Sequence, residues 1–170
     1  MLFYDSETKY IRVGLEQHHK LDFGWLNFTR LVYPNKILTN KNHFIDSTDR
    51  FNSIVEKYAY EKSTLYLFAH NVFFDIQVSG FFPYFTKAGW TLDFYYDKGL
   101  VYILSIRKGS RKIVCLSTTN YFSEKLAVVG KMIGLEKTEI DFEKSSHDEK
   151  VDYCFNDMMI IKQGMEYYFR

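Results

Sequence analysis

The chain has 170 residues, of which 46% are hydrophobic and 25% charged, a globular balance that excludes a largely disordered protein. Its 22 basic and 21 acidic residues give a net charge of +1, so charge alone neither supports nor excludes a nucleic-acid partner. Its apolar runs are too short to cross a membrane, and no signal peptide is visible. We expect one domain, 1–170, that is cytoplasmic and not secreted.

The first part of the chain alternates apolar runs with one amphipathic helix. Residues 2–5 form an apolar run that ends at an acid, and residues 10–15 are a second candidate strand. The segment 17–42 is mixed and fits neither period. Ser47 offers a helix N-cap before apolar residues at helical spacing over 51–58, which predicts a helix there.

The middle of the chain predicts a buried strand, a helix and a run of strands. Residues 64–69 are continuously apolar, which is typical of a central strand, and a helical pattern begins at Asn71. Three strands are expected over 90–117, joined by turns at 98–99 and 108–111.

Two helices close the chain. Ser123 is a candidate cap for a helix that runs to Ile133, and the last helix is expected over 148–168, with acids in its first turn as the helix dipole favours. Strands mixed with covering helices imply an α/β or α+β sandwich. Cys115 and Cys154 lie in apolar stretches without metal-ligand spacing, which favours a reducing compartment.

Acidic residues follow two of the predicted elements. Asp5 and Glu7 are two apart on a strand, so both face one side, where their mutual repulsion calls for a divalent cation. The alternative is an exposed strand end with two solvated acids. Asp75 lies among aromatic and aliphatic residues at the start of a helix, where an unpaired acid is costly; the alternative is a solvated acid favoured by the helix dipole.

A third acid lies on the last helix. Tyr153 and Asp157 are four residues apart, which places both on one helical face. Met158 and Ile161 lie nearby, so this face leans toward the core. The alternative is an ordinary surface acid beside a core tyrosine.

Taken in order, these elements resemble the three motifs of the DEDD superfamily of 3′–5′ exonucleases. The segments are Asp5-x-Glu7-Thr8, His70-Asn71-x-x-Phe74-Asp75 and Tyr153-x-x-x-Asp157, and the tyrosine marks the DEDDy branch. The chain looks closest to the proofreading domain of family B DNA polymerases of the protein-primed, viral or plasmid type. Two further family positions have counterparts in Ser117 and Lys137. The family favours Ser-Leu where this chain has Ser117-Thr118, and Lys137 aligns only with a gap.

The resemblance implies a fold and a chemistry. The fold is RNase H-like, with a mixed five-stranded sheet flanked by helices and a β-hairpin insertion. The four acids would bind two divalent ions, Mg²⁺ or Mn²⁺, with Asp5 bridging them, and Tyr153 would orient the attacking water. The residues implied in nucleic-acid binding are Thr8, His70, Asn71, Phe74, Ser117 and Lys137.

The implied partner is the 3′ end of single-stranded DNA in a bacterial, phage-infected or virus-infected cell. A polymerase domain or another replication protein is a second partner that the resemblance implies. An RNA substrate and a catalytically silent binding module remain alternatives. The 19% of aromatic residues suits base stacking as well as a core. The basic hairpin 107–112 reads as a solvated turn rather than a backbone contact, and His18-His19 reads as surface.

Overall fold

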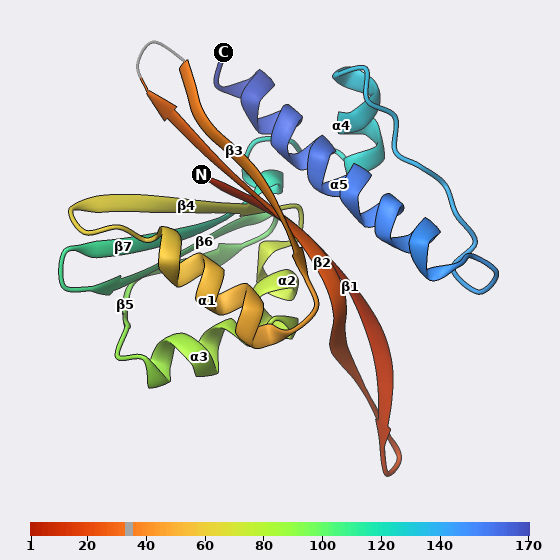
Figure 1. The fold of residues 1–170 in the computed structure, drawn as a ribbon, viewed down its shortest axis with the longest axis horizontal. Helices are drawn as coiled ribbons and strands as arrows, with labels where there is room; N and C mark the ends of the chain where they lie inside the picture. The colour runs from red at the N-terminus through yellow and green to blue at the C-terminus, as the bar shows by residue number, and fades with distance from the viewer. Residues whose placement is uncertain (33–35) are drawn as a thin grey trace.

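The structure is a computed structural model that describes residues 1–32 and 36–170. Its centre is a mixed seven-stranded sheet in the order β3-β2-β1-β4-β7-β6-β5, with helices on both faces (Figure 1). The strands are β1 (Leu2–Val13), β2 (Glu16–Val32), β3 (Lys36–Ile45), β4 (Ser63–Ala69), β5 (Thr91–Lys98), β6 (Val101–Lys108) and β7 (Arg111–Ser117). The helices are α1 (Thr48–Tyr58), α2 (Val72–Val78), α3 (Phe81–Lys87), α4 (Leu126–Met132), α5 (His147–Tyr168) and the 3₁₀ turn η1 (Thr118–Asn120).

The predicted count of five strands is wrong, because β5 and β6 pair onto β7 and extend the same sheet. Residues 10–15 are not a separate strand either: residues 10–13 continue β1. The undecided segment 17–42 falls mostly on β2 and β3, and its residues 33–35 lie outside the described part of the chain. Only the middle of β2 is buried, so its ends show no apolar alternation by which a strand is recognised.

The helix starts agree with local capping chemistry in two cases. Ser47 caps α1 by accepting from the backbone N–H of Arg50, and Ser146 forms a capping box with Glu149 at the start of α5. The predicted cap at Ser123 is wrong, because α4 begins only after Lys125 and no side chain bonds its first turn. The sequence pattern also missed α3 as a separate helix.

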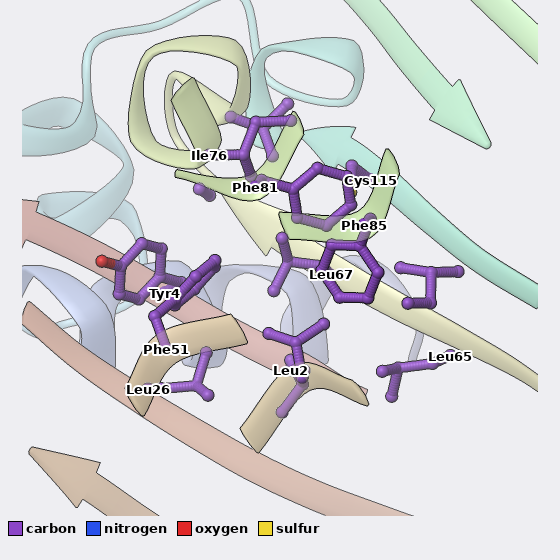
Figure 2. Packing of buried hydrophobic residues seen from close by; sticks show 14 of the residues in the cluster. Leu2, Tyr4, Leu26, Phe51, Leu65, Leu67, Ile76, Phe81, Phe85 and Cys115 are labelled. Atoms are coloured by element: carbon purple, nitrogen blue, oxygen red, sulfur yellow. The ribbon is translucent and has the colours of Figure 1, made fainter. Parts of the chain in front are cut away.

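The core is divided by the sheet into two clusters. One lies under α1, α2 and α3 and is built around Tyr4, Phe51 and Phe85 (Figure 2). The other lies under α4 and α5 and includes Phe3 and Met158. Neighbouring residues of β1 therefore enter different clusters, as strand alternation requires. Each fully buried side chain of this size contributes about 1.5–3 kcal/mol to the stability of the fold.

Strand β1 is held tightly to one neighbour and loosely to the other. A Cβ on Gly24 of β2 would lie 2.8 Å from both the backbone oxygen of Asp5 and the ring of Tyr4, so only glycine allows this approach. On the other side, β1 pairs with β4 through two residue pairs alone, Leu2 with Leu67 and Phe3 with Phe68. The two strands are no longer paired at Asp5.

Within the described residues, every helix is too short or too polar to span a bilayer.

Candidate functional site

The predicted acids of β1 lie at the point where this strand is no longer paired with β4. Asp5 and Glu7 face α5, and each places a carboxylate oxygen within 4.8 Å of the other and of the Cys154 sulfur. The Cys154 thiol also donates a hydrogen bond to the backbone oxygen of Asp5 at 3.4 Å, which fixes α5 against β1. The alternative of two solvated acids on a free strand end does not describe these half-buried side chains.

Asp75 reaches the same region from α2. Its side chain is 6% exposed, and the hydroxyl of Ser6 donates a hydrogen bond to its Oδ1 at 2.5 Å. Besides burial, the charge of Asp75 raises the pKa of Asp5, and the charge of Glu7 raises the pKa of Asp75, so Asp75 lies close to the acid pair. Burial raises the pKa of Asp75 to about 7, although the bond from Ser6 lowers it. Asp75 is therefore a buried acid at the site and not a solvated helix-dipole acid.

Asp157, Tyr153 and Lys137 form the third side of the site. Asp157 is 4% exposed and forms an ion pair with Lys137 through one carboxylate oxygen. Its other oxygen, Oδ1, is buried without a hydrogen-bond partner among the described residues. The Lys137 ammonium also lies 4.5 Å from the centre of the Tyr153 ring. Lys137, which aligns with the family only with a gap, therefore lies beside two of the predicted site residues.

The four carboxylates raise one another's proton affinity. Burial, together with the charges of Asp75, Asp157 and Glu7, raises the pKa of Asp5 well above its usual value. Burial and the charge of Asp157 raise the pKa of Glu7 to about 7. Burial also raises the pKa of Asp157, although Lys137 opposes it. A single ammonium cannot balance this group, so the cluster fits divalent cations, which prefer carboxylate oxygens.

Cys154 is the nearest other group with a metal-ligating atom. Burial and the nearby carboxylate of Asp5 raise the pKa of its thiol well above the usual range, so it stays protonated near neutral pH. Hard cations such as Mg²⁺ and Mn²⁺ prefer oxygen ligands to sulfur, which leaves the carboxylates as the ligand set. The prediction that Cys154 lies in purely apolar surroundings is wrong.

The other predicted binding residues fall into two groups, one around a cavity and one around His19. His70, Asn71 and Ser117 line a cavity of about 370 Å³ beside η1. There the Ser117 hydroxyl donates to the backbone oxygen of His70 at 2.5 Å, and the His70 ring is 2.8 Å from the hydroxyl of Thr118. Thr118 stands where the family favours leucine, and its hydroxyl holds the His70 ring.

Phe74 and Thr8 are not among the residues that line that cavity, and both contact His19 of β2. The Phe74 ring meets the His19 ring edge-on at 5.4 Å, and the Thr8 hydroxyl is 3.0 Å from His19 Nδ1. His19 was predicted to be simple surface. It has no spacing that marks a ligand, and only the cross-strand register of β1 and β2 brings it to Thr8. Ser6 was missed as well, although its position between two acids was a usable signal.

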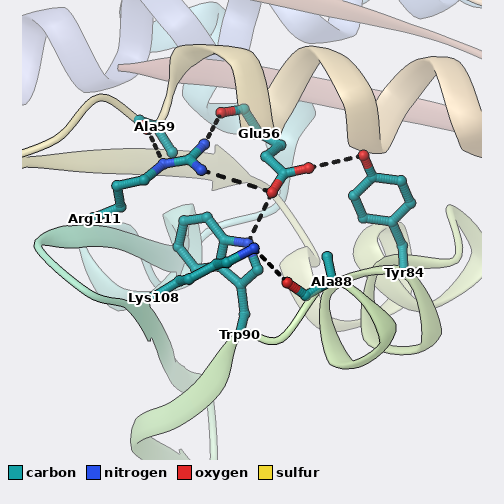
Figure 3. Close-up of polar contacts among 7 residues, drawn as sticks. All are labelled: Glu56, Ala59, Tyr84, Ala88, Trp90, Lys108 and Arg111. Atoms are coloured by element: carbon teal, nitrogen blue, oxygen red, sulfur yellow. Dashed lines mark hydrogen bonds and ion pairs between the residues drawn. The ribbon is translucent and has the colours of Figure 1, made fainter.

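The basic hairpin 107–112 was predicted to be a solvated turn, but several of its side chains make structural contacts within the protein. Arg111 donates to the backbone oxygens of Ala59 and Glu56 and stacks on Trp90, as Figure 3 shows. Lys108 donates to the backbone oxygen of Ala88. These bonds tie β7 to the end of α1 and β6 to the end of α3.

Comparisons with known proteins identify the fold. No protein-family model matches the sequence, and no curated protein matches it. Among solved structures, the chain is similar to phi29 DNA polymerase in three complexes: with primer-template DNA and incoming nucleotides (TM-score 0.61, 16% identity), with primer-template DNA after translocation (0.61, 16%), and with single-stranded DNA (0.62, 15%). Each match covers 99% of this chain but only 30% or 31% of the polymerase, so the chain spans less than a third of that protein's length. At this identity the likeness establishes a shared fold.

Proposed function

We propose that this protein is a metal-dependent 3′–5′ exonuclease of the RNase H-like, DEDDy type that removes nucleotides from the 3′ end of single-stranded DNA. The observation that carries the proposal is the close pair of Asp5 and Glu7 on β1, beside the buried acids Asp75 on α2 and Asp157 on α5. Burial and the charges of Asp75 and Asp157 raise the pKa of Asp5, and burial and the charge of Asp157 raise the pKa of Glu7. Asp157 also has a buried oxygen that has no partner among the described residues. Such a cluster is unstable without a cation and matches the donor set of a two-metal site. The acids are Asp5, Glu7, Asp75 and Asp157.

Asp5, Glu7, Asp75 and Asp157 would hold two Mg²⁺ or Mn²⁺ ions. When bound, such ions lower the pKa of water and offset charge on the leaving 3′ oxygen. The chain's own residues supply positioning. Tyr153 keeps its phenol proton, because burial raises its pKa above the usual value, and its hydroxyl would orient the attacking water. Lys137 holds Asp157 in place through their ion pair.

The substrate class follows from the surroundings of the acids and from the fold. Phe74 is next to Asp75 in the chain and offers a ring on which a terminal base could stack, and Asn71 lines a cavity beside η1. The similar polymerase structures are complexes with DNA, one of them with single-stranded DNA. We therefore assign DNA as the substrate and a proofreading role within or beside a family B polymerase as the biological setting.

The first test is shortening of a 5′-labelled DNA single strand. Mg²⁺ or Mn²⁺ is expected to support stepwise loss of 3′ nucleotides, and Ca²⁺ is expected to bind without turnover. A duplex is expected to be degraded more slowly, because unpairing its end costs free energy. A 3′ phosphate is expected to stop the reaction.

Three outcomes would contradict the proposal. Full activity in excess chelator would remove the metal site, and cutting of a closed single-stranded circle would show an endonuclease. Faster shortening of a matched RNA strand would make the protein an exoribonuclease.

A second test uses stability and pH without any substrate. Above about pH 7, Glu7 and Asp75 are ionised although burial disfavours their charged forms. The folded protein therefore loses stability as pH rises through about 7. Mg²⁺ is expected to offset this loss, so it should raise the melting temperature by several degrees at pH 8. At pH 5 both groups are protonated and the rise should nearly vanish.

At each pH the melting temperature is compared with and without Mg²⁺, so the contribution of groups that titrate in the opposite direction cancels. One such group is the Met1 amine, whose pKa burial lowers to about 6. An equal effect of Mg²⁺ at both pH values would mean that the ion binds elsewhere.

A further inference from the structure

The hairpin formed by residues 8–21 of β1 and β2, here called the arm, projects beyond the rest of the sheet (Figure 1). Its residues 12–20 are exposed on both faces, and no core supports them. A two-stranded ribbon alone is marginally stable in water. At its base, however, the arm contacts the candidate site through His19, which meets Phe74 and Thr8.

One face of the arm carries an aromatic pair. Tyr10 and His19 are directly opposite in the ladder, and their rings lie 4.5 Å apart. Tyr10 is 66% exposed, so most of its ring is open to a ligand. From Phe74 through His19 to Tyr10, three rings lead away from the acids in an unbroken series of contacts. Such a series suits stacking of successive bases, which is tolerant of sequence.

The charge on this face is positive. The next cross-strand pair is Arg12 with Gln17, and strand alternation places both on the same face as Tyr10. Arg12 forms no ion pair with any residue that the structure describes. The acid of the arm, Glu16, lies on the other face, where it pairs with His18 at 3.2 Å. An anionic strand along the aromatic pair would thus meet one cation and no carboxylate.

We propose that the arm is a second part of the strand-binding site. It would stack bases behind the 3′-terminal nucleotide on His19 and Tyr10, and bind a backbone phosphate with Arg12. The location of the 3′ end in this proposal rests on the proposed function. From Glu7 to Arg12 the strand rises about 17 Å at 3.4 Å per residue. Several nucleotides fit along it, at about 3.4 Å for each stacked nucleotide.

The test compares a long and a minimal DNA substrate. Wild-type protein is expected to hydrolyse (dT)12 with a higher kcat/KM than the dinucleotide TpT, which is too short to reach Tyr10. His19→Ala and Tyr10→Ala are each expected to lower kcat/KM for (dT)12 about tenfold, from the loss of one base stack. In Tyr10→Ala the loss for TpT should stay below about twofold, because that substrate is too short to reach Tyr10. His19→Ala is compared on (dT)12 alone, because it also loses the contacts with Phe74 and Thr8.

His18→Ala is the matched control, since His18 is adjacent in sequence, exposed and on the opposite face. It is expected to leave kcat/KM unchanged for both (dT)12 and TpT. Arg12→Gln is expected to weaken (dT)12 binding. It is also expected to reduce the slope of log binding constant against log salt concentration by about one, which corresponds to one lost phosphate contact.

Three results would overturn the arm proposal. The first is a wild-type kcat/KM on (dT)12 in both Tyr10→Ala and His19→Ala, and the second is an equal loss of kcat/KM on (dT)12 and TpT in Tyr10→Ala. The third is a loss of kcat/KM on (dT)12 in His18→Ala as large as that in the arm variants. Affinity for fluorescein-labelled (dT)12 in EDTA separates this proposal from the exonuclease itself. A tenfold weaker affinity in the arm variants of a protein that never shortens DNA would support the arm and overturn the exonuclease. Shortening of DNA with unchanged affinity in the variants would do the reverse.

Discussion

Replacing Asp5 with asparagine is expected to lower the exonuclease rate constant by about 10³-fold or more, because a metal-binding group worth several kcal/mol in the transition state is lost. The same change is expected to raise the melting temperature of the metal-free protein at pH 8. The charges of Asp75, Asp157 and Glu7 act on the Asp5 carboxyl, and a neutral amide in its place removes its part of this repulsion. One kcal/mol corresponds to roughly 2–4 °C in a protein of this size.

The combination of lost activity and gained stability is the diagnostic result, since an unfolded variant would lose both. Asp152→Asn on α5 is a matched control, because Asp152 is exposed and next to Tyr153 in sequence. It is expected to change neither quantity. An Asp5→Asn protein that melts lower than wild type and retains its rate would show that Asp5 is structural.

Replacing Tyr153 with phenylalanine is expected to lower the single-turnover rate by about 10²-fold, which is typical for a group that assists proton transfer. Metal affinity and DNA affinity should stay near wild type, because the hydroxyl is assigned to the attacking water alone. The ring contacts with Phe142 and with the Lys137 ammonium are retained in the variant. Stability is therefore expected to change little.

The competing view is that Tyr153 is an ordinary core-facing residue. In that case the variant would lose a hydrogen bond of about 1 kcal/mol at most, and its rate would be unchanged. Tyr167→Phe serves as control, since Tyr167 lies on the same helix and is 58% exposed. A normal rate in Tyr153→Phe would remove the reason for assigning the DEDDy branch.

Local pattern was enough to place much of the candidate site. The alternation that puts Asp5 and Glu7 on one face, and the helical spacing of Tyr153 and Asp157, are short-range properties of a strand and a helix. The capping residue Ser47 was likewise readable, because an N-cap depends on its next three residues. These features need no knowledge of the distant chain.

What could not be predicted depends on long-range pairing. The mixed segment 17–42 contributes strands whose partners are set by register and not by local propensity, and its ends are exposed. The contact of His19 with Phe74 joins residues far apart in sequence, as does the bond from Ser6 to Asp75. No local period encodes either pair.

The short join between β1 and β4 gives the site a mechanical character. The sheet is in effect two ladders, β3-β2-β1 and β4-β7-β6-β5, which share backbone bonds only beside Leu2 and Phe3. Asp5 belongs to the first ladder, while Asp75 follows the second through α2. Any ion bound by both acids would link the two ladders where β1 and β4 are no longer paired. Binding of the ion would then also fix the positions of the two ladders relative to each other.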